Sequence, residues 1–438
     1  MGNIGWRRVW RGWASVLVGS SLLAIAMSAG AQGWKLATNL TLKAELSVRE
    51  SFDSNVYLQD VEPSPSVTNA VKPFQESFVT SVTPRLALDW KPTAEFNLAT
   101  SYAPEVVRYH AEPSENHETH RVALTMSGQV GIVSWEQFNT LNYIDGNKEG
   151  LTFGIIENGV PAGAPAIGGI PIRDRREALI YRNGFRAFHP HGKWFFRPVA
   201  WSYVHDFRTE TRSRAQYPFY QNYVDRNDFT VGIDTGYKAF KNAYLIVGYR
   251  YGFQDETPLP GESVHYSNEY NRFVVGIEGK VADWMKIMGV IGPDYRDYAK
   301  ATPPGFDEHH TSLYYDATIS LTPTKRDTIT LLARKFEQPA FGAPSAYEDI
   351  TWEIAWRHQL DQRFTVGTGF RAYGGEWLSP VRRDDWIYTA SALLNYVHNQ
   401  HLSGELSYGY DWSESRVPNT SGREYTRHLV ALGMKYAF

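Results

Sequence analysis

The sequence predicts an all-β fold, a single transmembrane antiparallel up-and-down β-barrel of about 18 strands, with 16 as the alternative. Three observations predict it. The hydrophobic period is two from about residue 40 onward, tight turns alternate with long loops, and the chain ends in an alternating apolar row that finishes at Phe438. The same features predict one barrel domain at 32–438, preceded by a cleavable signal peptide at 1–31.

Composition favours strands as the membrane-crossing elements. Aromatic residues make up 14% of the chain, yet its mean hydropathy is only −0.40. A membrane barrel combines the two, because lipid-facing apolar residues alternate with polar lumen residues and aromatic girdles mark both interfaces. There is no Cys, which excludes disulfides, thiolate metal sites and Cys nucleophiles. The formal net charge of −3 gives no indication of nucleic-acid binding.

The first 31 residues have the three parts of a secretion signal. A basic start at 7–11 is followed by an apolar run at 14–27 and by small residues at 29–31. We expect export through the Sec pathway and cleavage after Ala31, with an uncleaved anchor as the alternative. Because the remaining chain has no apolar run long enough for a membrane helix, a membrane crossing must use strands.

Strand alternation is clearest in the middle of the chain. Between 229 and 238, apolar residues and one Thr occupy the odd positions, and polar residues or glycine the even ones; 245–254 repeats the pattern. Similar alternation occurs at 78–90, 273–280, 313–321, 350–360, 364–372, 386–396 and 402–412. At 135–143 and 194–208 neither face is cleanly apolar, so a bulge or a wrongly assigned strand there could change the count by two.

The connections alternate between tight and long along the whole chain. The tight ones fall at 91–93, 131–133, 190–192, 241–242, 282–283, 324–326, 361–362 and 399–400. The long ones fall at 53–75, 111–118, 145–174, 209–220, 255–265, 300–307, 336–346, 374–382 and 413–422. This alternation predicts short turns on the periplasmic side and long loops outside. An even number of strands places both ends of the barrel chain on the periplasmic side.

The last strand, 427–438, has Met434, Tyr436 and Phe438 on one face, in a row of apolar residues at every second position. This row resembles the C-terminal assembly signal of outer-membrane barrels. The resemblance implies recognition by the barrel assembly machinery and by periplasmic chaperones. The alternative is an ordinary amphipathic terminal strand.

The segment 51–57, Ser-Phe-Asp-Ser-Asn-Val-Tyr, resembles the start of the putative β-barrel porin type 2 family. Membership would imply a porin-like barrel in the outer membrane of a Gram-negative-type envelope, in contact with its lipid. Some relatives are associated with exopolysaccharide synthesis and export. The resemblance carries over no individual residue role, and we favour turn chemistry for Asp53 and Asn55.

The strand phases predict a lumen wall with about 16 basic and about 10 acidic side chains, so the interior should be basic. The candidate pore-lining residues are Arg85, Arg182, Arg186, Arg250, Arg334, Arg357 and Arg371. Such a wall would favour small anionic solutes or acidic polysaccharide. The alternative is that these charges pair across neighbouring strands and only solvate the wall.

The third long loop, 145–174, is apolar and rich in Gly and Pro in its middle. We expect it to enter the lumen, to cover the barrel mouth or to contact another subunit, and the sequence leaves the oligomeric state unknown. His309 and His310, after Asp307 and Glu308, could bind a metal, although solvated loop residues are the favoured interpretation.

No nucleophile and base, phosphate loop or paired-carboxylate motif is recognisable, so we expect no enzymatic activity, cofactor or metal. The leading functional hypothesis is a porin-like channel for passive passage of small hydrophilic solutes. The second is an outer-membrane component of exopolysaccharide secretion. A barrel enzyme or adhesive surface protein is the third class.

Overall fold

The structure is a computed structural model. It describes residues 33–58, 75–145, 156–157, 160–161, 177–208, 224–258, 263–340, 346–378, 384–415 and 425–438. The predicted signal peptide, 1–31, lies outside the described residues, as does most of loop 145–174. Within that loop only β7 (Ile156–Glu157) and β8 (Val160–Pro161) are described, and they pair antiparallel.

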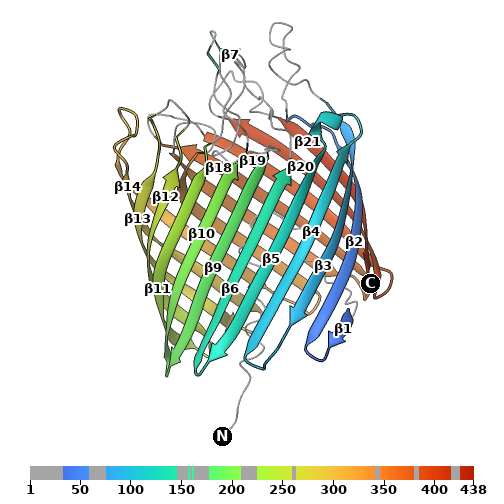
Figure 1. Cartoon of the computed structure of the whole chain (residues 1–438), viewed down its shortest axis with the longest axis horizontal. Coiled ribbons are helices and arrows are strands. Elements are labelled where there is room, and N and C mark those ends of the chain that lie inside the picture. Colours follow the sequence, from blue (N-terminus) through green and yellow to red (C-terminus); the bar gives the residue numbers. More distant parts are fainter. Residues whose placement is uncertain are drawn as a thin grey trace.

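The chain forms one closed barrel with tilted strands (Figure 1). The wall strands are β2 (Leu40–Asp53), β3 (Ser77–Trp90), β4 (Phe96–Tyr109), β5 (His117–Val130), β6 (Val133–Asp145), β9 (Ala178–His191), β10 (Trp194–Phe207), β11 (Arg226–Phe240), β12 (Asn242–Glu256), β13 (Asn268–Ala282), β14 (Met285–Tyr298), β15 (His309–Leu321), β16 (Asp327–Pro339), β17 (Ala346–Gln359), β18 (Phe364–Trp377), β19 (Asp384–Val397), β20 (Leu402–Ser415) and β21 (Thr426–Ala437). Each strand is antiparallel to the next, and β21 pairs with β2 to close the ring. The prediction of an 18-stranded, all-β barrel is confirmed.

Two small elements lie beside the wall. The short β1 (Trp34–Ala37) adds to the start of β2, and one turn of 3₁₀ helix (Pro113–Glu115) lies between β4 and β5. Among the described residues, no helix is long and apolar enough to cross a membrane.

The short connections gather at one end of the barrel, which we call the turn end, and the long ones at the opposite, loop end (Figure 1). Three short turns are stabilised in the same way, by a side-chain oxygen that accepts backbone hydrogen bonds. Asp361 Oδ1 accepts the backbone N–H groups two and three residues ahead at 2.7 Å each, and Asn399 Oδ1 does so at 2.8 Å. Thr324 Oγ1 accepts the equivalent pair at 3.1 Å. Short polar side chains therefore satisfy the backbone where the strands reverse.

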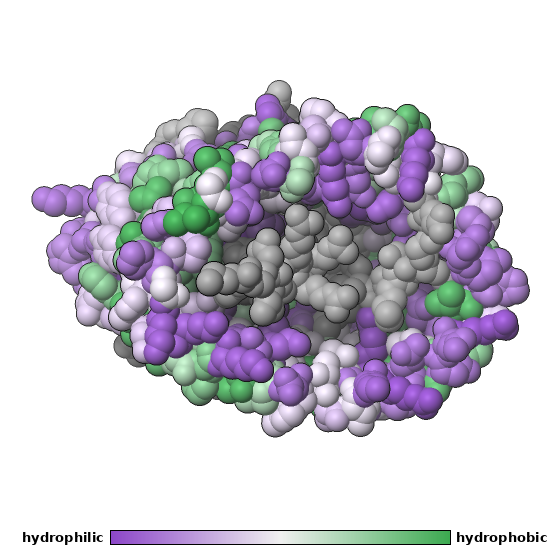
Figure 2. All heavy atoms as spheres, turned by 90° about the horizontal axis from the view of Figure 1, so that it is seen from below, coloured by the Kyte–Doolittle hydropathy of each residue, from purple (hydrophilic) through white to green (hydrophobic). Residues whose placement is uncertain are grey.

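The outer face of the barrel carries large apolar side chains that remain exposed. They include Ile233, Val247, Val275, Leu313, Ile354, Leu432 and Met434, the last two 61% exposed. Tyr436 and Phe438 continue this row to the turn end. The inner face is mainly polar, and the view from the turn end shows an oval outline with hydrophilic residues along much of its rim (Figure 2).

The strands with unclear phase, β6 and β10, are regular and paired along their length, without a bulge. Their alternation is blurred because apolar residues also point inward. The rings of Phe138 and Trp201 pack on the inner side, with centroids 5.3 Å apart, above Gly184 of β9. A Cβ at Gly184 would lie 2.2 Å from the Phe138 ring, so only glycine fits there.

Candidate functional site in the barrel interior

All seven candidate pore-lining arginines lie at strand positions whose side chains point inward, opposite in phase to the exposed apolar residues. Their part in permeation stays a prediction. Three of them have no ion pair with a carboxylate within the described part of the chain. Arg182 lies 5.4 Å from the centre of the Tyr203 ring, and Arg334 lies 5.2 Å from that of Phe336. The third is Arg371.

The wall formed by β2–β6 and β9 carries ion pairs that bridge neighbouring strands. They are Lys43–Asp89 (2.9 Å), Arg85–Glu45 (3.4 Å), Arg121–Glu105 (2.5 Å) and Arg186–Glu136 (2.5 Å). The basic partner is nearly half exposed in the first three, so water screens these pairs and each contributes little to stability. In this wall, the inward charges therefore pair across neighbouring strands, which is the alternative interpretation of the sequence.

The hairpin of β16 and β17 departs from the regular barrel. Strands β15 and β16 pair only from Leu321–Ile329 to Tyr315–Lys335, whereas β16 and β17 stay paired to Pro339–Ala346. Beyond Lys335 the hairpin has therefore separated from β15. We call residues 336–340 and 346–350 the inward hairpin end, because its contacts lie inside the barrel.

Glu337 shows the direction of this departure. By strand phase it belongs to the outer face, with Leu331 and Lys335, yet it is 0% exposed. Its carboxylate accepts hydrogen bonds from the Tyr298 hydroxyl and from His310 Nδ1, both at 2.6 Å, and those side chains point inward from β14 and β15. The outer face of the hairpin end thus packs on the inner face of the wall.

The inward hairpin end also contacts strands β11 and β12. The carbonyl oxygen of Pro339 accepts a hydrogen bond from Arg226 Nη1 of β11 at 3.0 Å, and β16 approaches β12 as well. Gln338 donates to Asp349 Oδ2 at 3.0 Å and contacts the hydroxyl of Tyr347. The hairpin end therefore spans from β16 to β11 across the interior.

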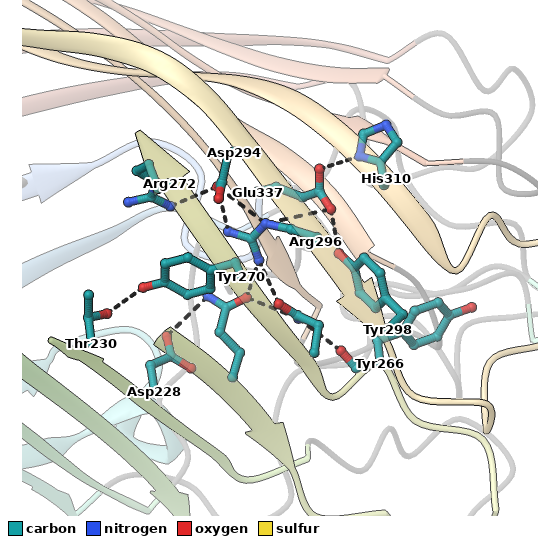
Figure 3. A network of polar contacts seen from close by, with 12 residues as sticks. Asp228, Thr230, Tyr266, Tyr270, Arg272, Asp294, Arg296, Tyr298, His310 and Glu337 are labelled. Atoms are coloured by element: carbon teal, nitrogen blue, oxygen red, sulfur yellow. Dashed lines mark hydrogen bonds and ion pairs between the residues drawn. The ribbon is translucent and has the colours of Figure 1, made fainter. Parts of the chain in front are cut away.

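A buried polar cluster adjoins the inward hairpin end, where Arg296 lies 3.8 Å from Glu337 (Figure 3). Asp294 accepts hydrogen bonds from Arg272 at 2.8 Å and from Arg296 at 3.0 Å. Arg296, 2% exposed, also donates to Gln254 at 2.6 Å and to Asn268 at 2.9 Å. Burying these charges is costly, and the dense pairing offsets that cost.

The structure corrects the predicted charge balance of the interior. The sequence phases missed further inward or buried charges: the basic Arg197, Arg226 and Arg272, and the acidic Asp53, Glu136, Asp228, Glu256, Glu337, Asp349 and Asp385. Because carboxylates predominate among them, the basic excess in the described barrel is much smaller than predicted. Arg272 directly precedes Phe273, where the detected alternation begins, so extending that phase by one residue would have found it.

Asp53 and Asn55 form a turn at the loop end of β2, and the turn interpretation is confirmed. Asp53 Oδ1 accepts the backbone N–H of Asn55 at 3.0 Å, as in an Asx-turn. The Asp53 carboxylate also accepts two hydrogen bonds from Arg427, at 2.9 and 2.8 Å. The pair links the first barrel strand to the last.

His309 and His310 do not face a common ligand. They are consecutive residues of β15, so their side chains point to opposite faces. His309 is paired with Asp297 at 2.7 Å on the exposed side, and His310 with Glu337 inside. In the described part of the chain, no group of three or more potential ligand residues could bind a metal ion.

No protein-family model matches the sequence, and no curated protein does either. Solved structures similar to it include the outer membrane protein OpdK of Pseudomonas aeruginosa, with 8% identity and a TM-score of 0.43, covering 91% of this chain and 99% of that one. Another is Acinetobacter baumannii OccAB3, with 10% identity and a TM-score of 0.44 over 91% and 99%. Because these similarities are low, the proposals below rest on this chain's own geometry. The resemblance of segment 51–57 to the porin type 2 family stays a prediction.

Proposed function

We propose that this protein is a porin-like channel of the outer membrane that lets small hydrophilic solutes pass passively. The observation that carries the proposal is the combination of an apolar, exposed outer wall with a charged, water-accessible inner wall in one closed barrel. A barrel of this strand number leaves an aqueous lumen unless something fills it. The outer apolar surface requires lipid, because soluble proteins do not expose such a belt.

The inward hairpin end is the proposed constriction. It fills one sector of the interior between β11 and β16, whereas the opposite wall of β2–β6 keeps exposed ion pairs. Solutes would pass between the two. Buried contacts between charged side chains, such as Arg296–Asp294 and His310–Glu337, hold the filled sector in place.

We propose a modest preference for anions, supported by Arg182, Arg334 and Arg371, which have no ion pair with any carboxylate that the structure describes. The charge pairs along β2–β6 are neutral as units and contribute little to selectivity. The net effect is smaller than the sequence phases indicate, because carboxylates balance most of the arginines. Secretion of exopolysaccharide rests on the sequence resemblance alone and is not proposed.

The export route and assembly follow from the same proposal. The outer row of Met434, Tyr436 and Phe438 is exposed beside the barrel closure, where the assembly machinery could bind it before β21 pairs with β2. Export through the Sec pathway, with removal of residues 1–31, completes the proposed route to the membrane.

The direct test of passive passage is solute-dependent swelling of liposomes that contain the folded protein. We expect rapid swelling in small sugars and amino acids, with rates that fall as solute size increases. Liposomes containing an unrelated closed barrel are the control. Absence of swelling with every solute, from protein shown to be folded, would contradict free diffusion.

A further inference from the structure

A polar row interrupts the apolar outer wall halfway between the two ends of the barrel. Asn139 of β6, Asn183 of β9 and Ser202 of β10 are direct cross-strand neighbours and form a row across three strands. Gln137 lies beside it on β6. Their outward phase is shared with exposed Leu141, whereas Phe138 and Trp201 occupy the inner face.

The row is only partly satisfied within the chain. Asn139 Oδ1 accepts hydrogen bonds from Asn183 Nδ2 at 2.6 Å and from the Tyr181 hydroxyl at 2.9 Å. The Gln137 amide has no hydrogen-bond partner among the described residues, and neither Asn139 Nδ2 nor Asn183 Oδ1 has one in the same part of the chain. Acyl chains offer no hydrogen bonds, so lipid cannot satisfy these groups.

The neighbouring strands make the contrast clear. At the same height, β5 presents Val122, Leu124 and Met126 outward, and β11 presents Phe229, Val231 and Ile233. Both flanks of the row are therefore ordinary lipid-facing surface. Together with the inward-pointing Phe138 and Trp201, the polar row makes the phases of β6 and β10 unclear in the sequence.

We propose that the outer face of β6, β9 and β10 is the contact surface between two copies of this chain in the membrane. The inference rests on the membrane location proposed above. Each amide in the row both donates and accepts hydrogen bonds, so the row is complementary to itself. It carries no charge, so two copies do not repel each other there.

Depth also favours a second copy as the partner. Two copies inserted in the same direction place the row at the same depth, and a two-fold axis along the membrane normal brings the rows together. An unrelated protein would need a matching polar row at that depth. The small outward residue Ala200 lies next to the row on β10 and permits close approach of the second barrel.

The first experiment compares the mass of the wild-type protein in nanodiscs with that of Gln137→Leu/Asn139→Leu/Asn183→Leu. We expect a dimer for the wild type and a monomer for the variant. Thr368→Leu, at an exposed outward position of β18, is the control and should stay dimeric. Heat-modifiable migration in detergent gels shows that each variant is folded.

The second experiment uses the absence of Cys in the chain. A single Cys at Asn183→Cys should form a reducible dimer on oxidation in native membranes, whereas Thr368→Cys should not. Two results would overturn the inference: a folded, membrane-inserted wild type that is monomeric, or cross-linking to a different protein at position 183. Neither result would contradict the proposed channel function. Failure of membrane insertion itself would instead contradict the proposed location.

Discussion

The carboxylate of Glu337 accepts the phenolic hydrogen of Tyr298 at 2.6 Å, although the two residues lie on strands that are not neighbours in the barrel. Regular β16 geometry would place Glu337 in lipid. The contact exists because the β16–β17 hairpin leaves the wall beyond Lys335 and turns inward. This departure fills one side of the interior, so in the proposed channel solutes would pass along the other side.

The Glu337 contacts should control how firmly the hairpin end is fixed. Glu337→Gln keeps the shape but removes the negative charge to which Tyr298 and His310 donate, and charge-assisted hydrogen bonds are the stronger kind. We expect frequent fluctuations between conductance levels in single-channel records. Glu105→Gln, on the exposed wall, is the control. A variant as steady as the wild type would show that the hairpin end is fixed by other contacts.

Asp294 should be the most sensitive charge in the barrel. Replacing it with Ala leaves Arg272 and Arg296 buried without their carboxylate, and such losses cost about 3–5 kcal/mol. Urea unfolding followed by tryptophan fluorescence measures the change. The matched exposed substitution, Asp89→Ala, should cost at most about 1 kcal/mol. Equal effects would mean that the cluster is hydrated.

The turn at Asp361 should make stability depend on pH. Backbone hydrogen bonds from Phe364 and Arg363 lower the pKa of Asp361 below its usual range. A lowered folded-state pKa means that the stabilisation is complete above the unfolded value of about 3.9 and is lost as the pH falls through the folded pKa. The protein should therefore lose stability relative to Asp361→Asn between about pH 5 and pH 2. The variant copies the native Asn399 turn, and a constant difference between the two proteins would refute the assignment.

Arginines without an ion pair in the described barrel should determine ion selectivity. Arg334→Gln/Arg371→Gln removes two positive charges that have no ion pair among the described residues, so the reversal potential in a salt gradient should move toward cation preference. Arg85→Gln/Glu45→Gln removes one paired charge of each sign and should leave it nearly unchanged. If both double variants behave alike, local pairing does not control permeation.

Removal of Phe438 should impair assembly more than folding. In a Gram-negative host we expect less folded barrel in the outer membrane, because the exposed terminal row loses its last member. Refolding of the purified chain in detergent should be unaffected. Leu394→Ala, on the outer face of β19, is the control. Equal defects in cells and in detergent would indicate a purely structural role.

The regular part of the barrel could be predicted because lipid and water impose a strict period of two on each strand. The turn positions, the strand count and the outward row ending at Phe438 follow from that pattern. The inward hairpin end did not, because 336–346 reads as an ordinary loop. Charged Lys335, Glu337 and Glu348 on the lipid-facing phase were the available signal, since such positions cannot remain in lipid.

The candidate site was predicted only in part for a similar reason. Phase alone places Arg334 and Arg371 inside, but it does not reveal which charges have partners. Pairing depends on contacts between strands, such as Arg272 of β13 with Asp294 of β14 and Arg226 of β11 with the Pro339 carbonyl of β16. Sequence alternation gives the direction of a side chain and not its neighbour.

The central claim is an aqueous barrel that conducts ions through a lumen narrowed by the inward hairpin end. Single-channel conductance of the folded mature protein in a planar bilayer, with the reversal potential in a salt gradient, tests it most directly. We expect stable open steps with a modest anion preference. A folded barrel that stays closed at every voltage would contradict the claim.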